Sequence, residues 1–198
     1  MSICFWAFDL INSMGLTGVA FAGYDAGGFV GESNPKLLHV GCPSLPYPVF
    51  FRAHTMINTR DSEPWSYGEQ VRASVETILN SDTNYCLISI RCFMMLPKRG
   101  MPVQRSLAID YTHDHRVYNN LYHNQYLAGP SILVAPAESN QQLLKIFFPQ
   151  GNWYDLYSCK VWSGNQETIV ESAYTQTSSI YKSRKCFAYA TFSRPHRS

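Results

Sequence analysis

Two polar side chains stand directly after short apolar runs and are the first candidates for chemistry. Asp25 lies in the Gly-rich loop GYDAGGF after the run 19–22, and His54 ends the run 48–54 together with Arg52. Carboxylates and imidazoles act as acids, bases and hydrogen-bonding groups. In a parallel barrel, polar groups at the carboxyl ends of the strands face the mouth of the active site. The spacing therefore predicts that Asp25 and His54 share one pocket.

Each of these residues also has a simpler interpretation. An Asp in a Gly-rich loop commonly caps its own turn. A single histidine fills many roles, and an ordinary core or surface position is one of them. The pattern leaves both alternatives open for Asp25 and for His54.

The remaining polar and aromatic candidates are weaker. His113, His115 and His123 have no Cys or carboxylate that completes a metal set, so we expect exposed loop residues and no metal site. Trp153 and Tyr154 could stack on a sugar ring, but aromatic residues at strand spacing more often form a core. Nothing resembles a Ser-His-Asp set or a phosphate-binding loop, and no cofactor is implied.

The elements that must position these residues follow from periodicity. A helical stretch from residue 10 ends at Gly15, and strands are predicted over 19–22 and 48–54. In the segment 59–78, Ser and Pro residues predict the start of a helix. Its solvated face is marked by Glu69, Arg72 and Glu76.

The pattern of apolar and turn-forming residues changes near residues 98–100. From there to residue 171, short apolar runs alternate with Gly, Pro and Asn turns, which predicts an antiparallel β-sandwich. The segments 38–47 and 79–97 show neither helical nor strand period, and neither does the tail 173–198.

Composition excludes several classes of partner. The formal net charge is +2 with no basic stripe, so nucleic acid is not implied. No apolar run is long enough to span a membrane, and the first residues lack the positive region and cleavage site of a signal peptide. The six cysteines are ambiguous, because an even count invites disulfides in a secreted chain, while Cys86 and Cys92 lack zinc-ligand spacing.

Several segments together closely resemble the α-glucosidases of glycoside hydrolase family 31. The segments occur in the family's order: SMGLTGVAFAGYDAGGFVG, FFRAH, RDSEPWSYGE, GMPVQRSLAIDYTHD, QYLAGPSILVAP and FPQGNWYDLYS. The resemblance implies that residues 10–97 are the last part of a (β/α)8 catalytic barrel. It also implies that residues 98–172 are the β-sandwich that follows the barrel.

The resemblance also assigns roles to four residues. Asp25 and Phe29 would belong to the wall of the subsite that holds the non-reducing glucose. His54 would hydrogen-bond the hydroxyls of that sugar, and Arg52 would support the loop. The partner implied is an α-glucoside or oligosaccharide.

The catalytic carboxylates of the family are expected elsewhere. A retaining glycosidase uses a nucleophile and a general acid on opposite sides of the scissile bond. In this family they lie in Trp-x-Asp-Met-Asn-Glu and Trp-x-Gly-Asp motifs, upstream of the segments found here, and neither motif occurs in this sequence. We therefore expect no useful glycosidase activity from these 198 residues. The rival expectations are a non-catalytic carbohydrate-binding β-sandwich that uses Trp153, Tyr154 and Tyr157, and a chain without a stable fold.

The departures from the family suggest shifts of the reading frame. One allowed codon spelling of residues 86–97, read one base earlier, gives Leu-Pro-Tyr-Leu-Tyr-Ser-Met-Phe-Tyr-Asp-Ala-Ala, the family's helix pattern. Similar respellings exist for 4–8, 38–44 and 175–186.

We hypothesise that four segments are out of frame: 1–9, 38–47, 79–97 and 173–198. All cysteines except Cys159 fall within them, and would then need no disulfide or metal explanation. The sandwich is expected to lose its final strands to the shifted tail.

Overall fold

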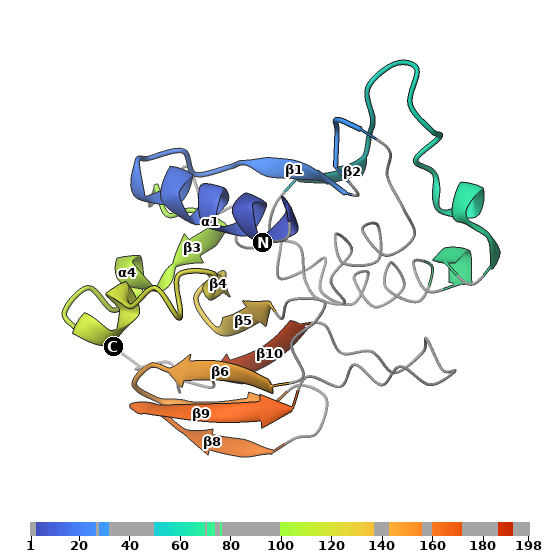
Figure 1. The fold of residues 1–198 in the computed structure, drawn as a ribbon. Coiled ribbons are helices and arrows are strands. Elements are labelled where there is room, and N and C mark those ends of the chain that lie inside the picture. Colours follow the sequence, from blue (N-terminus) through green and yellow to red (C-terminus); the bar gives the residue numbers. More distant parts are fainter. Residues whose placement is uncertain are drawn as a thin grey trace, which may run out of the picture.

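The computed structural model describes nine stretches of the chain (Figure 1): residues 3–26, 28–31, 50–69, 71–73, 76, 100–136, 143–155, 160–171 and 186–191. Three of the predicted out-of-frame segments fall wholly or largely outside these stretches. Segments 38–47 and 79–97 lie outside the described residues. The same holds for most of the tail 173–198.

Among its described residues, the N-terminal part contains the long helix α1 and a pair of parallel strands. Helix α1 spans Ile3–Leu16, and strands β1 (Gly23–Ala26) and β2 (Phe50–Ala53) follow. They pair in parallel with Asp25 opposite Arg52. Strand β2 lies within the predicted run 48–54. The strand predicted over 19–22 is wrong, because those residues are irregular and β1 begins at Gly23, where the sequence suggested a Gly-rich loop. The pairing with β2, and not the apolar run, decides where β1 lies. The helix begins well before residue 10, within the segment 1–9 that the sequence assigns to a wrong frame.

The loop after β2 contains the 3₁₀-helix η1 (Pro64–Tyr67), and residues 71–73 are helical. Pro64 occupies the first turn of η1, where its missing N–H has no helical partner to lose. The predicted solvated face is confirmed, because Glu69, Arg72 and Glu76 are all exposed. Arg72 and Glu69 form an ion pair at 2.8 Å.

Antiparallel strands dominate the C-terminal part. A six-stranded sheet has the order β3-β4-β5-β10-β7-β8, and a second sheet pairs β6 with β9. The strands are β3 (Gln104–Ser106), β4 (Tyr126–Ala128), β5 (Ile132–Pro136), β6 (Leu143–Phe148), β7 (Asn152–Asp155), β8 (Val161–Ser163), β9 (Gln166–Glu171) and β10 (Cys186–Thr191). Between β3 and β4 lie the short helices α4 (Leu107–Asp110) and η2 (His115–Tyr118).

The expectation that this part loses its final strands to the tail is wrong for residues 186–191. These residues form β10, which lies between β5 and β7 in the six-stranded sheet. Cys186 is opposite Pro136, and Thr191 is opposite Trp153. The tail therefore supplies backbone hydrogen-bonding partners to strands on both of its sides, which no local sequence period predicts.

Strand β5 is buried on both faces of its sheet. Leu133 and Ala135 belong to a core cluster with Ile146, Phe148 and Trp153, on the side of β6 and β9. Side chains point alternately to the two faces of a strand. Ile132 and Val134 accordingly pack on the opposite side, in a second cluster with Phe8 of α1. The six-stranded sheet thus joins the two parts of the chain, as the position of α1 above β3 illustrates (Figure 1).

Within the described stretches, no helix is long and apolar enough to cross a membrane.

Candidate functional site

The parallel pair β1–β2 brings Asp25 and Arg52 together. They stand opposite each other in the register, and Arg52 Nε donates to Asp25 Oδ1 at 2.6 Å. Both residues belong to four-residue strands at the ends of apolar runs. The side chain of Asp25 therefore reaches across to the neighbouring strand.

The loops after the two strands meet as well. The rings of Phe29 and His54 stack with centroids 5.5 Å apart and planes inclined by 21°. The backbone N–H of Met56 donates to the carbonyl oxygen of Phe29 at 2.9 Å. The four residues singled out from the sequence thus form two contacts, an ion pair and a ring stack, on adjoining strands and loops. We call Asp25, Phe29, Arg52 and His54 the four-residue cluster.

The four-residue cluster is open to solvent. The side chain of Arg52 is 50% exposed and that of Asp25 is 20% exposed, while Phe29 is 42% exposed. Exposed ion pairs of this kind contribute only about 0–1 kcal/mol to stability. The cluster is therefore better suited to presenting groups to a ligand than to holding the fold together. It offers charged hydrogen-bonding groups next to an aromatic ring, a combination that suits the hydroxyls and C–H faces of a sugar.

The simpler interpretation of Asp25 as a turn cap applies only to its backbone. Its carbonyl oxygen accepts from Gly28 N at 3.1 Å, which closes the turn. Its carboxylate is instead engaged by Arg52. His54 is exposed and contacts Phe29, which excludes the core position and leaves the ordinary surface position open.

The contact between Met56 and Phe29 was not identified from the sequence. It joins the loop after β1 to the loop after β2 through backbone atoms. Backbone partners leave no side-chain signature. The parallel pairing of the two strands is the only feature that could have suggested it.

The other candidates from the sequence are His113, His115, His123, Trp153, Tyr154 and Tyr157. His113 and His115 are exposed, and among the described residues no group of three His, Cys, Asp or Glu side chains is arranged to hold a metal. Trp153 is fully buried, and its indole Nε1 donates to Pro149 O at 2.8 Å. It therefore belongs to the core and is not available to stack on a sugar. Tyr154 is half-buried, and Tyr157 lies outside the described residues.

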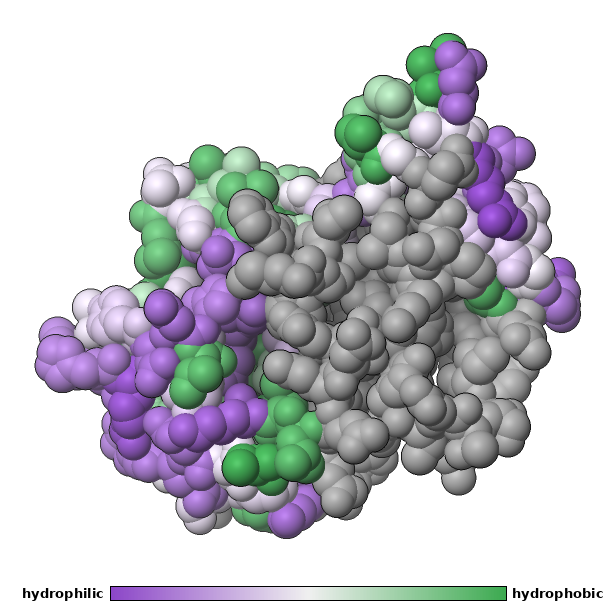
Figure 2. Space-filling model, in the orientation of Figure 1, coloured by the Kyte–Doolittle hydropathy of each residue, from purple (hydrophilic) through white to green (hydrophobic). Residues whose placement is uncertain are grey.

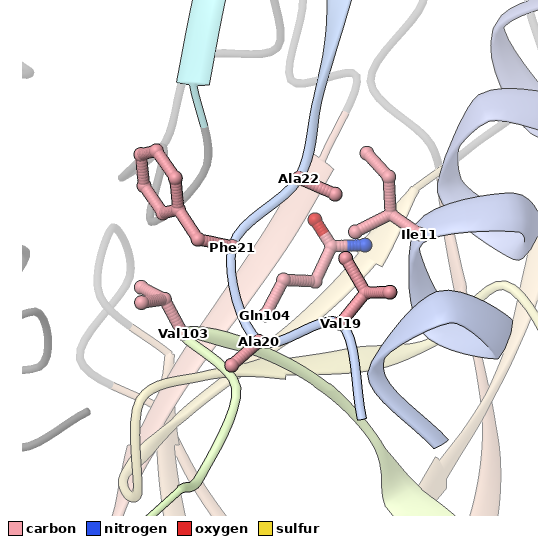
Figure 3. A pocket seen from close by; sticks show the side chains of 7 residues that line it. All are labelled: Ile11, Val19, Ala20, Phe21, Ala22, Val103 and Gln104. Atoms are coloured by element: carbon pink, nitrogen blue, oxygen red, sulfur yellow. The ribbon is translucent and has the colours of Figure 1, made fainter. Parts of the chain in front are cut away.

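A hollow lies between α1 and the segment that leads into β1 (Figure 3). Its lining consists of Ile11, Val19, Ala20, Phe21, Ala22, Val103 and Gln104. The lining contains no charged group, and its one polar side chain, Gln104, is hydrogen-bonded to α1. The hollow lacks the several convergent polar groups that a sugar site needs.

Two sequence profiles of one enzyme family match the chain in succession. The profile of the glycosyl hydrolases family 31 TIM-barrel domain matches residues 6–85, and that of the family 31 C-terminal domain matches residues 100–185. Together they account for most of the chain. The chain belongs to glycosyl hydrolase family 31. The first profile includes the whole four-residue cluster, and the family resemblance seen in the sequence is confirmed.

Curated relatives of the chain include α-glucosidases. Alpha-glucosidase 2 of Bacillus thermoamyloliquefaciens is 31% identical over 167 residues, which are 84% of this chain and 21% of that protein. Human neutral alpha-glucosidase AB is 32% identical over 157 residues, 78% of this chain and 16% of that protein. The chain thus spans about a fifth of the length of these relatives.

Solved structures of family 31 enzymes share the fold. A GH31 alpha-xylosidase from a soil metagenome, complexed with xylose, superposes with a TM-score of 0.75 at 22% identity. The match covers 93% of this chain and 29% of that one. A Flavobacterium johnsoniae GH31 dextranase complexed with glucose gives a TM-score of 0.69 at 18% identity, covering 91% of this chain and 22% of that one.

Proposed function

We propose that these 198 residues supply one wall of the glucose-binding subsite of a family 31 α-glucosidase. The observation that carries the proposal is the convergence of the four-residue cluster. Asp25 and Phe29 come from β1 and its loop, and Arg52 and His54 come from β2 and its loop. The ion pair at 2.6 Å and the ring stack at 5.5 Å bring all four to one end of the parallel pair.

Each residue then has a distinct task. The Asp25 carboxylate accepts hydrogen bonds from sugar hydroxyls, and Arg52 holds that carboxylate in place across the strand pair. His54 hydrogen-bonds a further hydroxyl, and its ring is held flat against Phe29. The α-glucosidases and glucose-complexed dextranase among the relatives support a glucose-type ligand.

The proposal includes the architecture around the cluster. In it, β1 and β2 are strands of a (β/α)8 barrel, and the strands after residue 100 form a β-sandwich. Exposed apolar residues support the barrel assignment, because Leu16, Val19 and Phe21 are 43–55% exposed along the connection from α1 to β1. Hydrophobic surface gathers in this region of the molecule (Figure 2), as expected where further barrel elements would pack.

Catalysis requires groups beyond the cluster. Retaining hydrolysis needs two carboxylates about 5–5.5 Å apart, one as nucleophile and one as acid. Within the cluster Asp25 is the one carboxylate, and it is paired with a cation. The nucleophile and the acid are therefore assigned to other segments of the family's catalytic domain, and the 198 residues are assigned to binding.

The experiment is a titration of the ¹⁵N-labelled 198-residue chain with methyl α-glucoside, followed by nuclear magnetic resonance. We expect saturable shifts confined to residues in and around the four-residue cluster. The variant His54→Ala should abolish them while its spectrum remains that of a folded chain. Tyr118→Ala, which alters an exposed ring on η2, is the matched control and should leave the shifts unchanged. Absence of saturable shifts in the folded wild type, or shifts that survive in His54→Ala, would refute the assignment.

A further inference from the structure

Three buried amide side chains lie around the six-stranded sheet, outside the four-residue cluster. Asn12, Gln104 and Gln125 are only 3–4% exposed. Buried amides are costly unless they are hydrogen-bonded, so the partners of each one indicate what it holds in place. The partners divide into two sets, one on each side of the sheet.

Gln104 and Asn12 tie β3 and the end of the loop before β4 to α1. Gln104 Nε2 donates to Asn12 Oδ1 at 3.0 Å and to Phe8 O at 3.4 Å. Asn12 Nδ2 in turn donates to the carbonyl oxygens of His123 at 3.1 Å and Gln125 at 3.5 Å. Gln125 faces the other way and pairs with the backbone of Phe147 in β6, at 3.0 and 3.1 Å.

We propose that Gln104 is a positioning residue for the four-residue cluster, acting through α1 and the segment that enters β1. The inference rests on the proposed function for its meaning in sugar binding. The claim that Gln104 controls the geometry of the four-residue cluster rests on contacts in the structure and does not depend on sugar binding.

The first link runs from Gln104 to residues 19–22, the segment that leads into β1. The Gln104 side chain lies beside residues 19–22 and Ile11 in the hollow between them (Figure 3). The neighbouring backbone N–H of Val103 donates to Ala20 O at 3.3 Å. Helix and sheet approach closely here, since a Cβ on Gly15 would lie 3.2 Å from Pro102 Cγ.

The second link runs from α1 to β1 itself. Tyr24 packs edge-on against Phe8 of α1, with centroids 5.5 Å apart. Phe8 stacks on Tyr126 of β4 at 5.8 Å. The residue directly before Asp25 is thus seated on the helix whose backbone Gln104 holds. A displaced α1 would shift Tyr24, and with it the ion pair and the ring stack.

The experiment measures the His54 ring protons by nuclear magnetic resonance in the full chain. Stacking on Phe29 should shift these protons upfield, so their position reports the geometry of the cluster without any sugar. Gln104→Met keeps the volume of the side chain but removes its hydrogen bonds. We expect it to move the His54 signals toward those of an unstacked histidine.

Two further variants separate positioning from general stability. Gln125→Met makes the same chemical change in the buried amide that faces β6, and we expect His54 signals unchanged from wild type. The exchange Asn12→Gln with Gln104→Asn restores the combined length of the pair, and we expect it to return the signals toward wild type relative to Gln104→Asn alone. This comparison also decides the question if Gln104→Met does not fold.

Unchanged His54 signals in folded Gln104→Met would overturn the proposal, and so would equal displacement in Gln125→Met or no recovery in the exchanged pair. A failure of glucose binding with the expected His54 behaviour would instead contradict the proposed function and leave the positioning role intact.

Discussion

Asp25 and Arg52 form a largely exposed ion pair whose contribution to stability is small. The pair is 2.6 Å apart, and its side chains are 20% and 50% exposed. Solvent screens such a pair, so it contributes about 0–1 kcal/mol. In the proposed sugar site, the opposite strand would hold the carboxylate in one orientation.

The sequence singled out four residues that lie on adjoining strands and loops, but it did not predict the contacts between them. Polar residues at the ends of two apolar runs were enough to single out Asp25 and His54, and the family resemblance added Phe29 and Arg52. The pairing of Asp25 with Arg52 depends on the register of β1 against β2, and the stacking of Phe29 on His54 depends on the loops after them. Register is specified by the hydrophobic pattern and by the turn, and two strands of four residues joined by a long connection offer too little of either.

Trp153 is a core residue, and its removal should destabilise the fold. It is fully buried among Phe148 and its neighbours, and its indole is hydrogen-bonded to Pro149 O. Trp153→Ala should lower the free energy of unfolding by about 3–5 kcal/mol, since a large core side chain is lost. Tyr154→Ala on the same strand should cost clearly less, because that side chain is only partly buried. Urea unfolding followed by circular dichroism measures both, and equal losses would contradict the core assignment of Trp153.

Among the elements, η2 is connected to the turn between β8 and β9 through Arg116. Arg116 pairs with Asp114 at 2.6 Å, donates to Asn165 O at 2.9 Å and lies 4.7 Å from the centroid of the Phe147 ring. The hydrogen bond from Arg116 holds the pKa of the Asp114 carboxyl below its usual range. In the sheet formed by β6 and β9, the hydrogen bond from Lys145 lowers the pKa of Glu167.

These shifts predict a loss of stability in acid. A carboxyl whose pKa is lower in the folded chain than in the unfolded chain stabilises the fold above its ordinary pKa of about 4. That contribution disappears as the pH falls through the lowered pKa. Asp114→Asn keeps an oxygen that can cap η2 but removes the charge. The difference in urea midpoint between wild type and Asp114→Asn should therefore shrink from neutral pH toward pH of about 3. A difference that does not change with pH would contradict the role given to Asp114.

Strand β10 gives a second prediction at this scale. It lies between β5 and β7, so its removal leaves both with unpaired backbone groups and opens new sheet edges. A chain ending at residue 185 should lose its cooperative thermal transition or melt well below the full chain. A chain ending at residue 191 retains β10 and serves as the control. Identical melting of the 185-residue and full-length chains would show that β10 does not stabilise the sheet.

The elements recovered from the sequence are those whose burial follows a simple period. The run ILVAP is apolar throughout because β5 is buried on both faces, and it was recognised as a strand. The run CFAYAT of β10 lies in a tail rich in Ser, Thr, Lys and Arg, and only its pairing with β5 and β7 identifies it. The start of α1 at Ile3 was missed for a similar reason, because contacts of α1 with β3 support the helix beyond its own pattern.

At the scale of the whole molecule, the frame-shift hypothesis stays a prediction about the gene. Two of its segments, 38–47 and 79–97, lie outside the described residues, whereas residues 3–9 and 186–191 form parts of α1 and β10. The nucleotide sequence tests it directly. We expect the real codons of residues 86–97, read one base earlier, to give the family's Leu-Pro-Tyr-Leu-Tyr pattern. Codons that cannot be read this way would reject the hypothesis for that segment.

We propose that the chain carries a glucose-binding wall without the groups that cleave the bond. It spans about a fifth of its α-glucosidase relatives and contains neither of the family's catalytic motifs. The direct measurement is the release of nitrophenol from 4-nitrophenyl α-glucoside by the purified chain, once a cooperative melt shows that it is folded. We predict no release above the uncatalysed rate. Release that His54→Ala abolishes would contradict the claim, because it would place the catalytic groups within these 198 residues.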